Sequence, residues 1–239
     1  MTVLIVSGTG TGVGKTIVTA AIAALARDRG LRVAVVKPGQ TGVAAGEPGD
    51  LDDVGRLSLV DDLHEHARFP DPLAPAAAAR VAGRPPLDVA GSIEAIRALE
   101  LSRDLVIVEG AGGLLVRFDE QGSTIADWAT ALAAPVLVVA HPSLGTLNHT
   151  ELTIEAVRRR GLNLAGVVLG SWPIDPDLAC RSNLRDLATI AGRPISGALA
   201  QGAGQLRPPE FLAAARAGLE PALGGDFDAG DFTRGHAHA

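Results

Sequence analysis

Short apolar runs alternate with longer amphipathic stretches along the chain. The runs rich in β-branched residues are apolar at consecutive positions, which is typical of strands buried on both faces: 3–6, 33–36, 105–108, 136–139 and 165–169. The stretches between them are predicted to be helices: 15–29, 92–101, 147–160 and 178–190. Repeated alternation of strands and helices indicates right-handed βαβ crossovers. The pattern therefore predicts an α/β fold, a three-layer α/β/α sandwich with a mostly parallel sheet.

Two segments depart from this alternation. Residues 69–87 are rich in Pro and Ala, and we expect a loop with about one helical turn there. Residues 224–239 carry Gly, Asp, His236 and His238 without an apolar period, so we expect a flexible tail after a single domain over 1–223. Two histidines alone do not indicate a metal site.

Composition and charge narrow the class of protein. A chain of 239 residues with 47% hydrophobic and 20% charged residues is expected to be globular, not disordered, collagen-like or coiled-coil. Aromatic residues make up 3% and the net charge is −6, so we expect no nucleic-acid partner. The lone Cys180 has no partner for an internal disulfide. Without a cationic leader or an apolar run of about 20 residues, we expect a cytoplasmic protein with no membrane partner.

A glycine-rich segment between the first strand and the first helix has the residues of a phosphate-binding loop. It reads Gly8-Thr-Gly-Thr-Gly-Val-Gly-Lys15-Thr16. In such loops backbone N–H groups surround the phosphates, the Lys reaches the terminal phosphates, and the Thr hydroxyl binds Mg²⁺. The common spacing would place its first glycine at position 9, which is Thr9 here, so this is a variant loop. An ordinary glycine-rich turn would not require the Lys-Thr pair.

Carboxylates and a second lysine follow the predicted strands. Lys37 and Thr41 come at the end of the second strand, and we expect them to face the ligand crevice, although Lys37 could equally be a surface residue that ends the strand. Glu109 ends the strand at 105–108. Because Mg²⁺ takes few carboxylates besides phosphate oxygens and water, one Asp and Glu109 beside Thr16 would complete a site. The residues leave open which of three aspartates contributes: Asp50, Asp52 or Asp53.

A third segment lies just beyond the strand at 136–139. It reads Leu144-Gly-Thr-Leu-Asn148-His. Thr146 can cap the helix that follows, which would leave N–H groups suited to an anion; a plain helix cap is the alternative.

Taken together, these motifs resemble the dethiobiotin synthetase family of P-loop NTPases. The blocks occur in order from Thr2 to about Pro173: the loop at 8–16, Lys-Pro-x-x-Thr-Gly at 37–42, Glu-Gly-Ala-Gly-Gly at 109–113, and Leu-Gly-x-Leu-Asn-His at 144–149. The resemblance implies ATP- and Mg²⁺-dependent closure of the ureido ring of dethiobiotin from 7,8-diaminopelargonate (7,8-diaminononanoate) and CO₂ or bicarbonate. This cyclo-ligase reaction of biotin biosynthesis passes through a carbamate and a carbamic–phosphoric anhydride and releases ADP and phosphate.

The resemblance also implies roles for individual residues. Catalytic roles fall to Lys37, Lys15 and Thr11. The nucleotide would contact Gly12, Val13, Gly14, Lys15, Thr16, Ile17, Gly170 and Ser171. The acceptor substrate would contact Thr11, Lys37, Thr41, Gly112, Gly145, Thr146, Leu147 and Asn148. The metal ligands would be Thr16, Asp50 and Glu109. The family implies a homodimer with active sites at the subunit interface, in which the helix start at 145–148 comes from the partner subunit.

The chain departs from the family pattern at two places. Many members carry an acidic residue where this chain has Gly12. The adenine-reading Asn of the family is replaced in the segment Gly170-Ser-Trp-Pro173, and the next Asn is Asn183. We therefore expect weak base discrimination, with other nucleoside triphosphates also accepted; the alternative is that a loop at 200–208 reads adenine.

Three other functions are alternatives for a chain with such a loop. A partitioning-type P-loop ATPase acting on DNA or membranes would carry a signature Lys at Gly10 and a basic or amphipathic tail. A cobyrinate-type amide synthetase would need a glutaminase domain with a Cys nucleophile, whereas Cys180 lies in a predicted helix. A non-catalytic nucleotide-binding switch is the third alternative.

Overall fold

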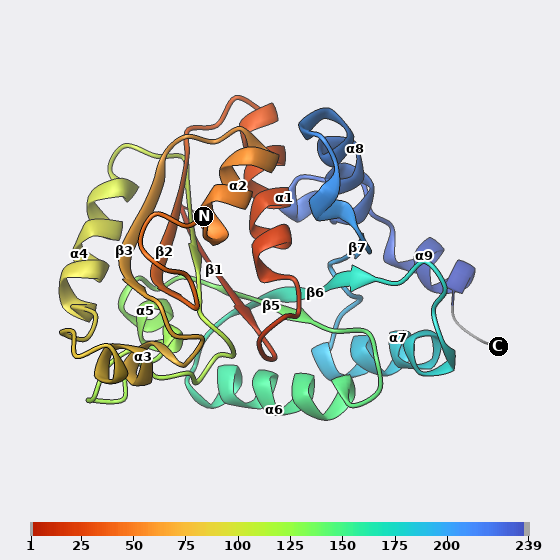
Figure 1. The fold of residues 1–239 in the computed structure, drawn as a ribbon. Coiled ribbons are helices and arrows are strands. Elements are labelled where there is room, and N and C mark those ends of the chain that lie inside the picture. Colours follow the sequence, from red (N-terminus) through yellow and green to blue (C-terminus); the bar gives the residue numbers. More distant parts are fainter. Residues whose placement is uncertain (1, 237–239) are drawn as a thin grey trace.

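A twisted parallel sheet forms the middle of the molecule. The computed structural model describes residues 2–236, and within them the strands form one seven-stranded sheet in the order β3-β2-β4-β1-β5-β6-β7, with each pair of neighbours parallel (Figure 1). The strands are β1 (Val3–Gly8), β2 (Val33–Thr41), β3 (Leu63–Phe69), β4 (Leu105–Glu109), β5 (Val136–Ala140), β6 (Leu164–Trp172) and β7 (Gly197–Ala200).

Helices cover both faces of this sheet. One face packs against α1 (Lys15–Asp28), α2 (Asp50–Ser58) and α8 (Pro208–Gly218). The opposite face packs against α4 (Val89–Glu100), α5 (Ile125–Ala131), α6 (Thr146–Arg159) and α7 (Leu178–Ala191). The remaining helices are α3 (Pro75–Val81), α9 (Ala229–His236) and the short 3₁₀ turns η1 (Ala203–Gln205) and η2 (Pro221–Leu223). The predicted three-layer α/β/α sandwich with a parallel sheet is confirmed.

Small and branched aliphatic residues build the core, as the low aromatic content requires. Ile5, Ile107 and Leu137 are completely buried in the central strands. Helix α1 presents alanines to the sheet, so its backbone approaches the strands closely. Within residues 2–236, no helix is both long enough and apolar enough to cross a bilayer.

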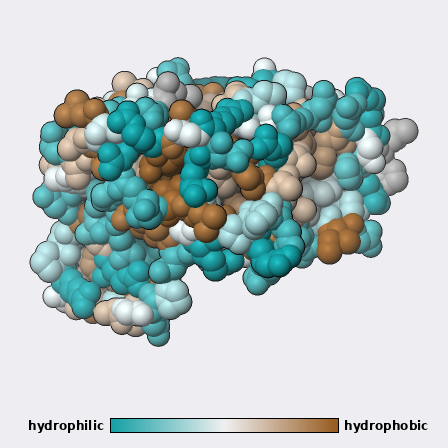
Figure 2. Space-filling model, turned by 90° about the horizontal axis from the view of Figure 1, so that it is seen from above, coloured by the Kyte–Doolittle hydropathy of each residue, from teal (hydrophilic) through white to brown (hydrophobic). Residues whose placement is uncertain are grey.

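The strand register brings the chemically important residues to one end of the sheet. Val36 pairs with Val108 and Val6 pairs with Glu109, so Lys37 and the phosphate loop follow at the same level as Glu109. Figure 2 views the opposite end, where apolar side chains lie among hydrophilic ones. The exposed large apolar side chains on the turns before β2, β3 and β4 are Leu31, Leu59 and Leu101.

Each strand and helix predicted from hydrophobic periodicity is present, and several elements without a clear period were not predicted. Strand β3 has the sequence LHEHARF and is half-buried at the sheet edge, so polar residues obscure it. The segment 69–87, expected to be a loop with one turn, contains the seven-residue helix α3. Helices α2, α5 and α8 and strand β7 are likewise additional.

The C-terminal segment forms a helix where we expected a tail without regular structure. The indole of Trp172 contacts the rings of Phe232 and His236 at centroid distances of 5.1 and 5.5 Å, and Phe232 stacks on His236 at 4.4 Å. Phe227 is buried beside them. Widely spaced aromatic residues therefore attach α9 to the end of β6, a contact that periodicity does not reveal. His238 lies outside the described residues.

Candidate active site

The phosphate loop connects β1 to α1 through two glycines with positive φ. Gly12 has φ +74° and Gly14, the residue before the helix, has φ +94°, a conformation that favours glycine. Lys15 opens the helix, and its Nζ donates a hydrogen bond to the carbonyl oxygen of Gly10 at 2.9 Å. The loop is thus held in a curled form with its lysine folded back onto its own backbone.

The end of β6 packs directly on this loop. A Cβ at Gly170 would lie 2.0 Å from the carbonyl oxygen of Val13, and a Cβ at Gly14 would lie 2.7 Å from the carbonyl oxygen of Gly170. Both positions therefore require glycine, for reasons of space between two backbones. This contact places Ser171 beside the nucleotide loop.

Lys37 lies between two carboxylates at the base of the site. Its Nζ is 2.7 Å from Glu109 Oε1 and 2.5 Å from Asp50 Oδ2. The hydroxyl of Thr16 donates to the same Glu109 oxygen at 3.0 Å. Lys37 and Glu109 are 3% and 1% exposed, so this pair is buried in the sheet. The structure thus brings together the phosphate-loop threonine, the second lysine and both proposed metal-binding carboxylates.

The two lysines of the site experience opposite electrostatic environments. Burial would lower the pKa of Lys37, but the charges and hydrogen bonds of Glu109 and Asp50 outweigh it and raise the pKa above its ordinary value. Burial lowers the pKa of Lys15, with the nearby charge of Lys37 acting in the same direction and Glu109 and Asp50 opposing it. The folded protein therefore stabilises the charged form of Lys37, whereas for Lys15 the two carboxylates do not offset the effect of burial.

The donor set fits a magnesium ion. Glu109 Oε2 is buried and has no hydrogen-bond partner within the described residues, and such an orphaned carboxylate oxygen is expected to have a ligand. Asp50 faces Lys37, whereas Asp52 accepts from the backbone N–H of Gly49 and Asp53 pairs with Arg56. Within residues 2–236 no group of three or more His, Cys, Asp or Glu could hold a metal by itself. Magnesium with few protein ligands and phosphate oxygens matches that pattern.

A cavity of about 690 Å³ opens above these residues. Its polar side includes Thr11, Lys15, Thr16, Lys37, Thr41, Asp50, Glu109 and Gly112. Its apolar side is formed by Pro72, Leu73, Ala74, Pro75 and Val116. A cleft with convergent charges on one side and apolar groups on the other can bind a polar reacting centre that carries an alkyl chain.

Residues 145–148 do not line this cavity. Gly145, with φ +95°, precedes α6, and Thr146 is the first helical residue with its buried hydroxyl 3.4 Å from that of Thr150. The prediction that Thr146 caps the helix was therefore wrong, because the chain enters α6 through a glycine turn. Gly145 and Asn148 are exposed, Leu147 is half-buried, and Leu144 is 87% exposed.

Gly170 and Ser171, which we expect to contact the base, do not line this cavity. Asn183 donates from Nδ2 to the carbonyl oxygens of Pro142 and Ser143, so its amide is used to support the turn before α6. Ser171 lines a smaller cavity of about 240 Å³ that also includes Gln201. The loop at 200–208 reaches the start of α1, where a Cβ at Gly204 would lie 2.8 Å from the side chain of Ile17.

Some residues that line the site were not predicted from the sequence. Gln40 lies inside the block that contains Lys37 and Thr41, and its amide is buried against Asp50, so its place in that block was a usable signal. The apolar wall at 72–75 fell in the segment expected to be a loop, and nothing in its composition indicated that it faces a cavity.

Comparison with known proteins agrees with this geometry. Residues 2–203 match a family described as an AAA domain. The chain is 62% identical to a dethiobiotin synthetase of Parafrankia sp. (strain EAN1pec), over 99% of this chain and 100% of the relative. It is 60% identical to the Saccharopolyspora erythraea protein of that name (94% and 98% covered) and 54% identical to that of Streptomyces coelicolor (99% and 99% covered).

Solved structures show the same fold at low sequence identity. A ParA family ATPase from Chlorobium tepidum TLS has a TM-score of 0.56 at 16% identity, with 98% of each chain covered. The Pyrococcus furiosus cell division ATPase MinD has a TM-score of 0.53 at 19% identity, with 90% of each chain covered. These likenesses concern the fold alone. The near-complete alignments at 54–62% identity are decisive, and the chain belongs to the ATP-dependent dethiobiotin synthetase family.

Proposed function

We propose that this protein is an ATP-dependent dethiobiotin synthetase, which closes the ureido ring of dethiobiotin from 7,8-diaminopelargonate and CO₂. The observation that carries the proposal is the buried Lys37 between Asp50 and Glu109, beside the phosphate loop and open to the cavity. Relatives with up to 62% identity carry that enzyme's name. The reaction forms two C–N bonds and consumes one ATP.

The phosphate loop binds the nucleotide. Its backbone N–H groups and the Lys15 ammonium contact the phosphates, and Lys15 exchanges the Gly10 carbonyl for phosphate oxygens. Thr16, Asp50 and Glu109 would hold Mg²⁺, consistent with the unpartnered Glu109 Oε2. When bound, the ion neutralises charge on the phosphate oxygens.

The proposed reaction has three steps. CO₂ adds to one amine of the acceptor and forms a carbamate with loss of a proton. A carbamate oxygen attacks the γ-phosphorus, and the bond from phosphorus to ADP breaks. The second amine attacks the carbamate carbon, loses a proton and expels phosphate. Phosphoryl transfer depends mainly on orientation and charge neutralisation, which Lys15 and Lys37 supply, while Thr11 and Thr41 donate hydrogen bonds to the carbamate or phosphate.

The acceptor spans two subunits of a homodimer. Its diamine end lies beside Lys37 and Gly112, its methylenes contact the apolar wall at 72–75, and its carboxylate binds the start of α6 from the partner subunit. Supporting this, residues 145–148 begin a helix, are partly exposed and do not line the cavity of their own chain. A helix start favours an anion because its first N–H groups lack acceptors.

Nucleoside triphosphates other than ATP also act as phosphoryl donors in the proposed reaction. Asn183 is engaged with backbone carbonyls, and Gly170 has no side chain, so backbone groups and Ser171 contact the base. Such contacts discriminate weakly between bases.

Phosphate release and dethiobiotin formation, measured together, test the proposed function. Both products should require ATP, Mg²⁺, 7,8-diaminopelargonate and bicarbonate, with dethiobiotin detected by mass spectrometry in proportion to phosphate. Phosphate release that ignores the diamine and rises with DNA or lipid vesicles would instead support a partitioning-type ATPase. Release that requires a corrinoid acid and an amide donor would support the cobyrinate-type alternative.

A further inference from the structure

Helix α2 begins after a glycine, which has no side chain to accept from the first helical N–H groups, and its Asp52 accepts only from the N–H of Gly49 itself. Its N-cap residue is Gly49, and the first N–H groups of any helix need acceptors from outside the helix. A side chain from β2 supplies one of them: Oε1 of Gln40 accepts a hydrogen bond from the backbone N–H of Asp50 at 3.0 Å. Gln40 is 4% exposed, and the bond to the half-buried Asp50 is partly buried.

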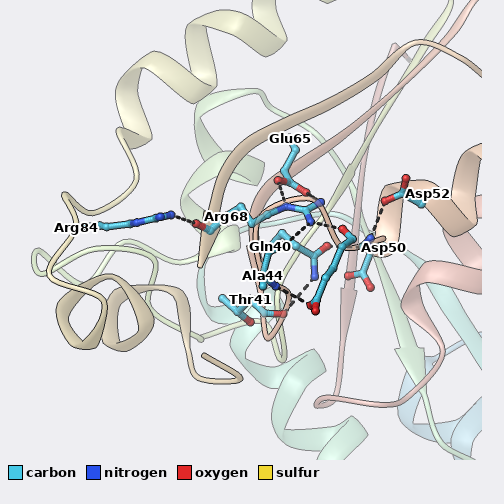
Figure 3. Close-up of polar contacts among 10 residues, drawn as sticks. Gln40, Thr41, Ala44, Asp50, Asp52, Glu65, Arg68 and Arg84 are labelled. Atoms are coloured by element: carbon cyan, nitrogen blue, oxygen red, sulfur yellow. Dashed lines mark hydrogen bonds and ion pairs between the residues drawn. The ribbon is translucent and has the colours of Figure 1, made fainter. Parts of the chain in front are cut away.

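Both ends of the Gln40 amide are in contact with backbone groups. Its Nε2 donates to the carbonyl oxygen of Thr41 at 3.2 Å. Gly49 packs directly against it, since a Cβ there would lie 3.0 Å from Gln40 Oε1 and 3.0 Å from Arg68 Nη2. Figure 3 shows Gln40 between the strand end at Thr41 and the helix start at Asp50.

Arg68 on β3 fixes the loop that leads into α2. Its guanidinium makes a two-point contact with Glu65 at 2.6 and 2.8 Å. It also donates to the carbonyl oxygens of Ala44 and Glu47 at 3.2 and 2.5 Å (Figure 3). Hydrogen bonds from Arg68 and Gln40 therefore connect the 42–49 loop and the first residue of α2 to the sheet.

The position of the Asp50 carboxylate depends on these contacts more than the positions of Lys37 and Glu109 do. Lys37 and Glu109 belong to sheet strands, and their side chains are 4% and 1% exposed. The Asp50 side chain is 35% exposed and stands on the first residue of a helix after a glycine-containing loop. The Gln40 bond is made to the backbone of that same residue.

We infer that Gln40 is a positioning residue that sets the place of the Asp50 carboxylate for the metal–nucleotide complex. The inference rests on the proposed function only in taking Asp50 as a metal ligand. Groups that orient metal ligands commonly change metal affinity by about 10–100-fold when removed. Gln40 acts through the backbone of Asp50, so we expect the lower end of that range.

The test compares Gln40→Met, which loses the acceptor at similar size, with Gln40→Glu, which retains an oxygen. Mn²⁺ binding in the presence of a non-hydrolysable ATP analogue is measured by electron paramagnetic resonance, without diamine. We expect Gln40→Met to weaken Mn²⁺ binding about tenfold and Gln40→Glu to remain within about threefold of the wild type or bind more tightly. Gln121→Met, at an exposed glutamine, is the matched control and should bind as the wild type does.

A second variant disturbs Gln40 from the other side. Gly49→Ala places a methyl group 3.0 Å from both Gln40 Oε1 and Arg68 Nη2, so it should weaken Mn²⁺ binding while leaving Gln40 in the chain. Thermal unfolding identifies any variant that does not fold. Wild-type Mn²⁺ affinity in folded Gln40→Met or folded Gly49→Ala, or equal weakening in Gln40→Glu and Gln40→Met, would overturn the inference. If wild-type protein binds Mn²⁺ with the analogue but shows no diamine-dependent phosphate release, the proposed function fails and this inference stands.

Discussion

Replacing either lysine of the site should strongly lower turnover, but the two replacements should change the free energy of unfolding differently. Lys37→Met removes the cation between Asp50 and Glu109, and Lys15→Met removes a buried cation whose hydrogen bond is to a backbone carbonyl. Each lysine is directed at phosphoryl oxygens in the proposed reaction. Loss of one such group commonly costs about 10²–10³ in turnover, and we expect at least that for both.

The expected stability change for Lys37→Met follows from burial. Glu109 is 1% exposed and would be left without its cation, a change that typically costs about 3–5 kcal/mol. Because the Asp50 side chain is 35% exposed, water relieves part of this cost, and we expect about 3 kcal/mol. For a chain of this length that corresponds to a fall in Tm of about 6–12 °C. Methionine has a similar volume, so a cavity contributes little.

Replacing Lys15 should leave the free energy of unfolding unchanged or raise it. Burial lowers the pKa of Lys15, so folding disfavours its charged form, and Lys15→Met should unfold at the wild-type denaturant concentration or above it. The pKa of Lys37 is raised, so its contribution is fully present below the unfolded-state pKa of about 10.4 and is lost as the pH rises through the higher folded-state pKa. The gap between wild type and Lys37→Met should therefore persist from pH 6 to 10 and shrink above that range.

Urea unfolding without nucleotide, together with dethiobiotin formation, measures both effects. Circular dichroism gives the unfolding midpoint, and mass spectrometry gives the rate. Wild-type stability in Lys37→Met would show that the ion pair with Glu109 does not exist in solution. Near-normal dethiobiotin synthesis in either variant would exclude that lysine from the proposed role.

Three further predictions test the remaining parts of the proposal. In the proposed dimer each site uses the phosphate loop of one subunit and the α6 start of the other. Mixing Lys15→Ala subunits with Asn148→Asp subunits should therefore restore activity in about a quarter of the sites. A fully active monomer in sedimentation would contradict this. CTP, GTP and UTP should each give kcat/KM within about tenfold of ATP, about 1.4 kcal/mol, whereas a preference above about a hundredfold for ATP would refute weak discrimination. Phe232→Ala should lower the unfolding free energy by about 1–2 kcal/mol, because it removes a half-buried ring that contacts Trp172 and His236, and an unchanged Tm would contradict the packing of α9.

The sequence predicts most of the fold because its central strands and covering helices have clear periods. Strands apolar at every position that alternate with amphipathic helices are typical of a covered parallel sheet, so β1, β2, β4, β5 and β6 were predicted. Edge strand β3 carries His, Glu and Arg at half-buried positions, and its pattern is that of a polar segment. Helix α9 is held by contacts of Phe232 and His236 with Trp172, some sixty residues earlier in the chain.

The candidate site was predictable where a reactive residue type occurs in a short motif at the carboxyl end of a predicted strand. Lys15 and Thr16 follow β1, Lys37 lies within β2, and Glu109 is the last residue of β4. The parallel register brings them to one end of the sheet. The choice among three aspartates was not predictable from spacing alone, because it depends on how α2 begins. The structure directs Asp50 to Lys37 and uses Asp52 within the first turn of the helix.

The packing of the phosphate loop gives a physical reason why position 170, beside the proposed base site, carries no side chain. At Gly170 a Cβ would lie 2.0 Å from the Val13 carbonyl oxygen, so no side chain fits without moving the loop. Gly170→Asn should therefore fail to create a preference for ATP. We expect it to lower kcat/KM for ATP and CTP alike by at least about tenfold, because the displaced loop binds the phosphates of both. Ser171→Asn, at the half-buried neighbour, is the control that adds the same amide without this overlap. A Gly170→Asn enzyme that keeps its rate with ATP and loses it with CTP would show that the loop yields and that this position does select the base.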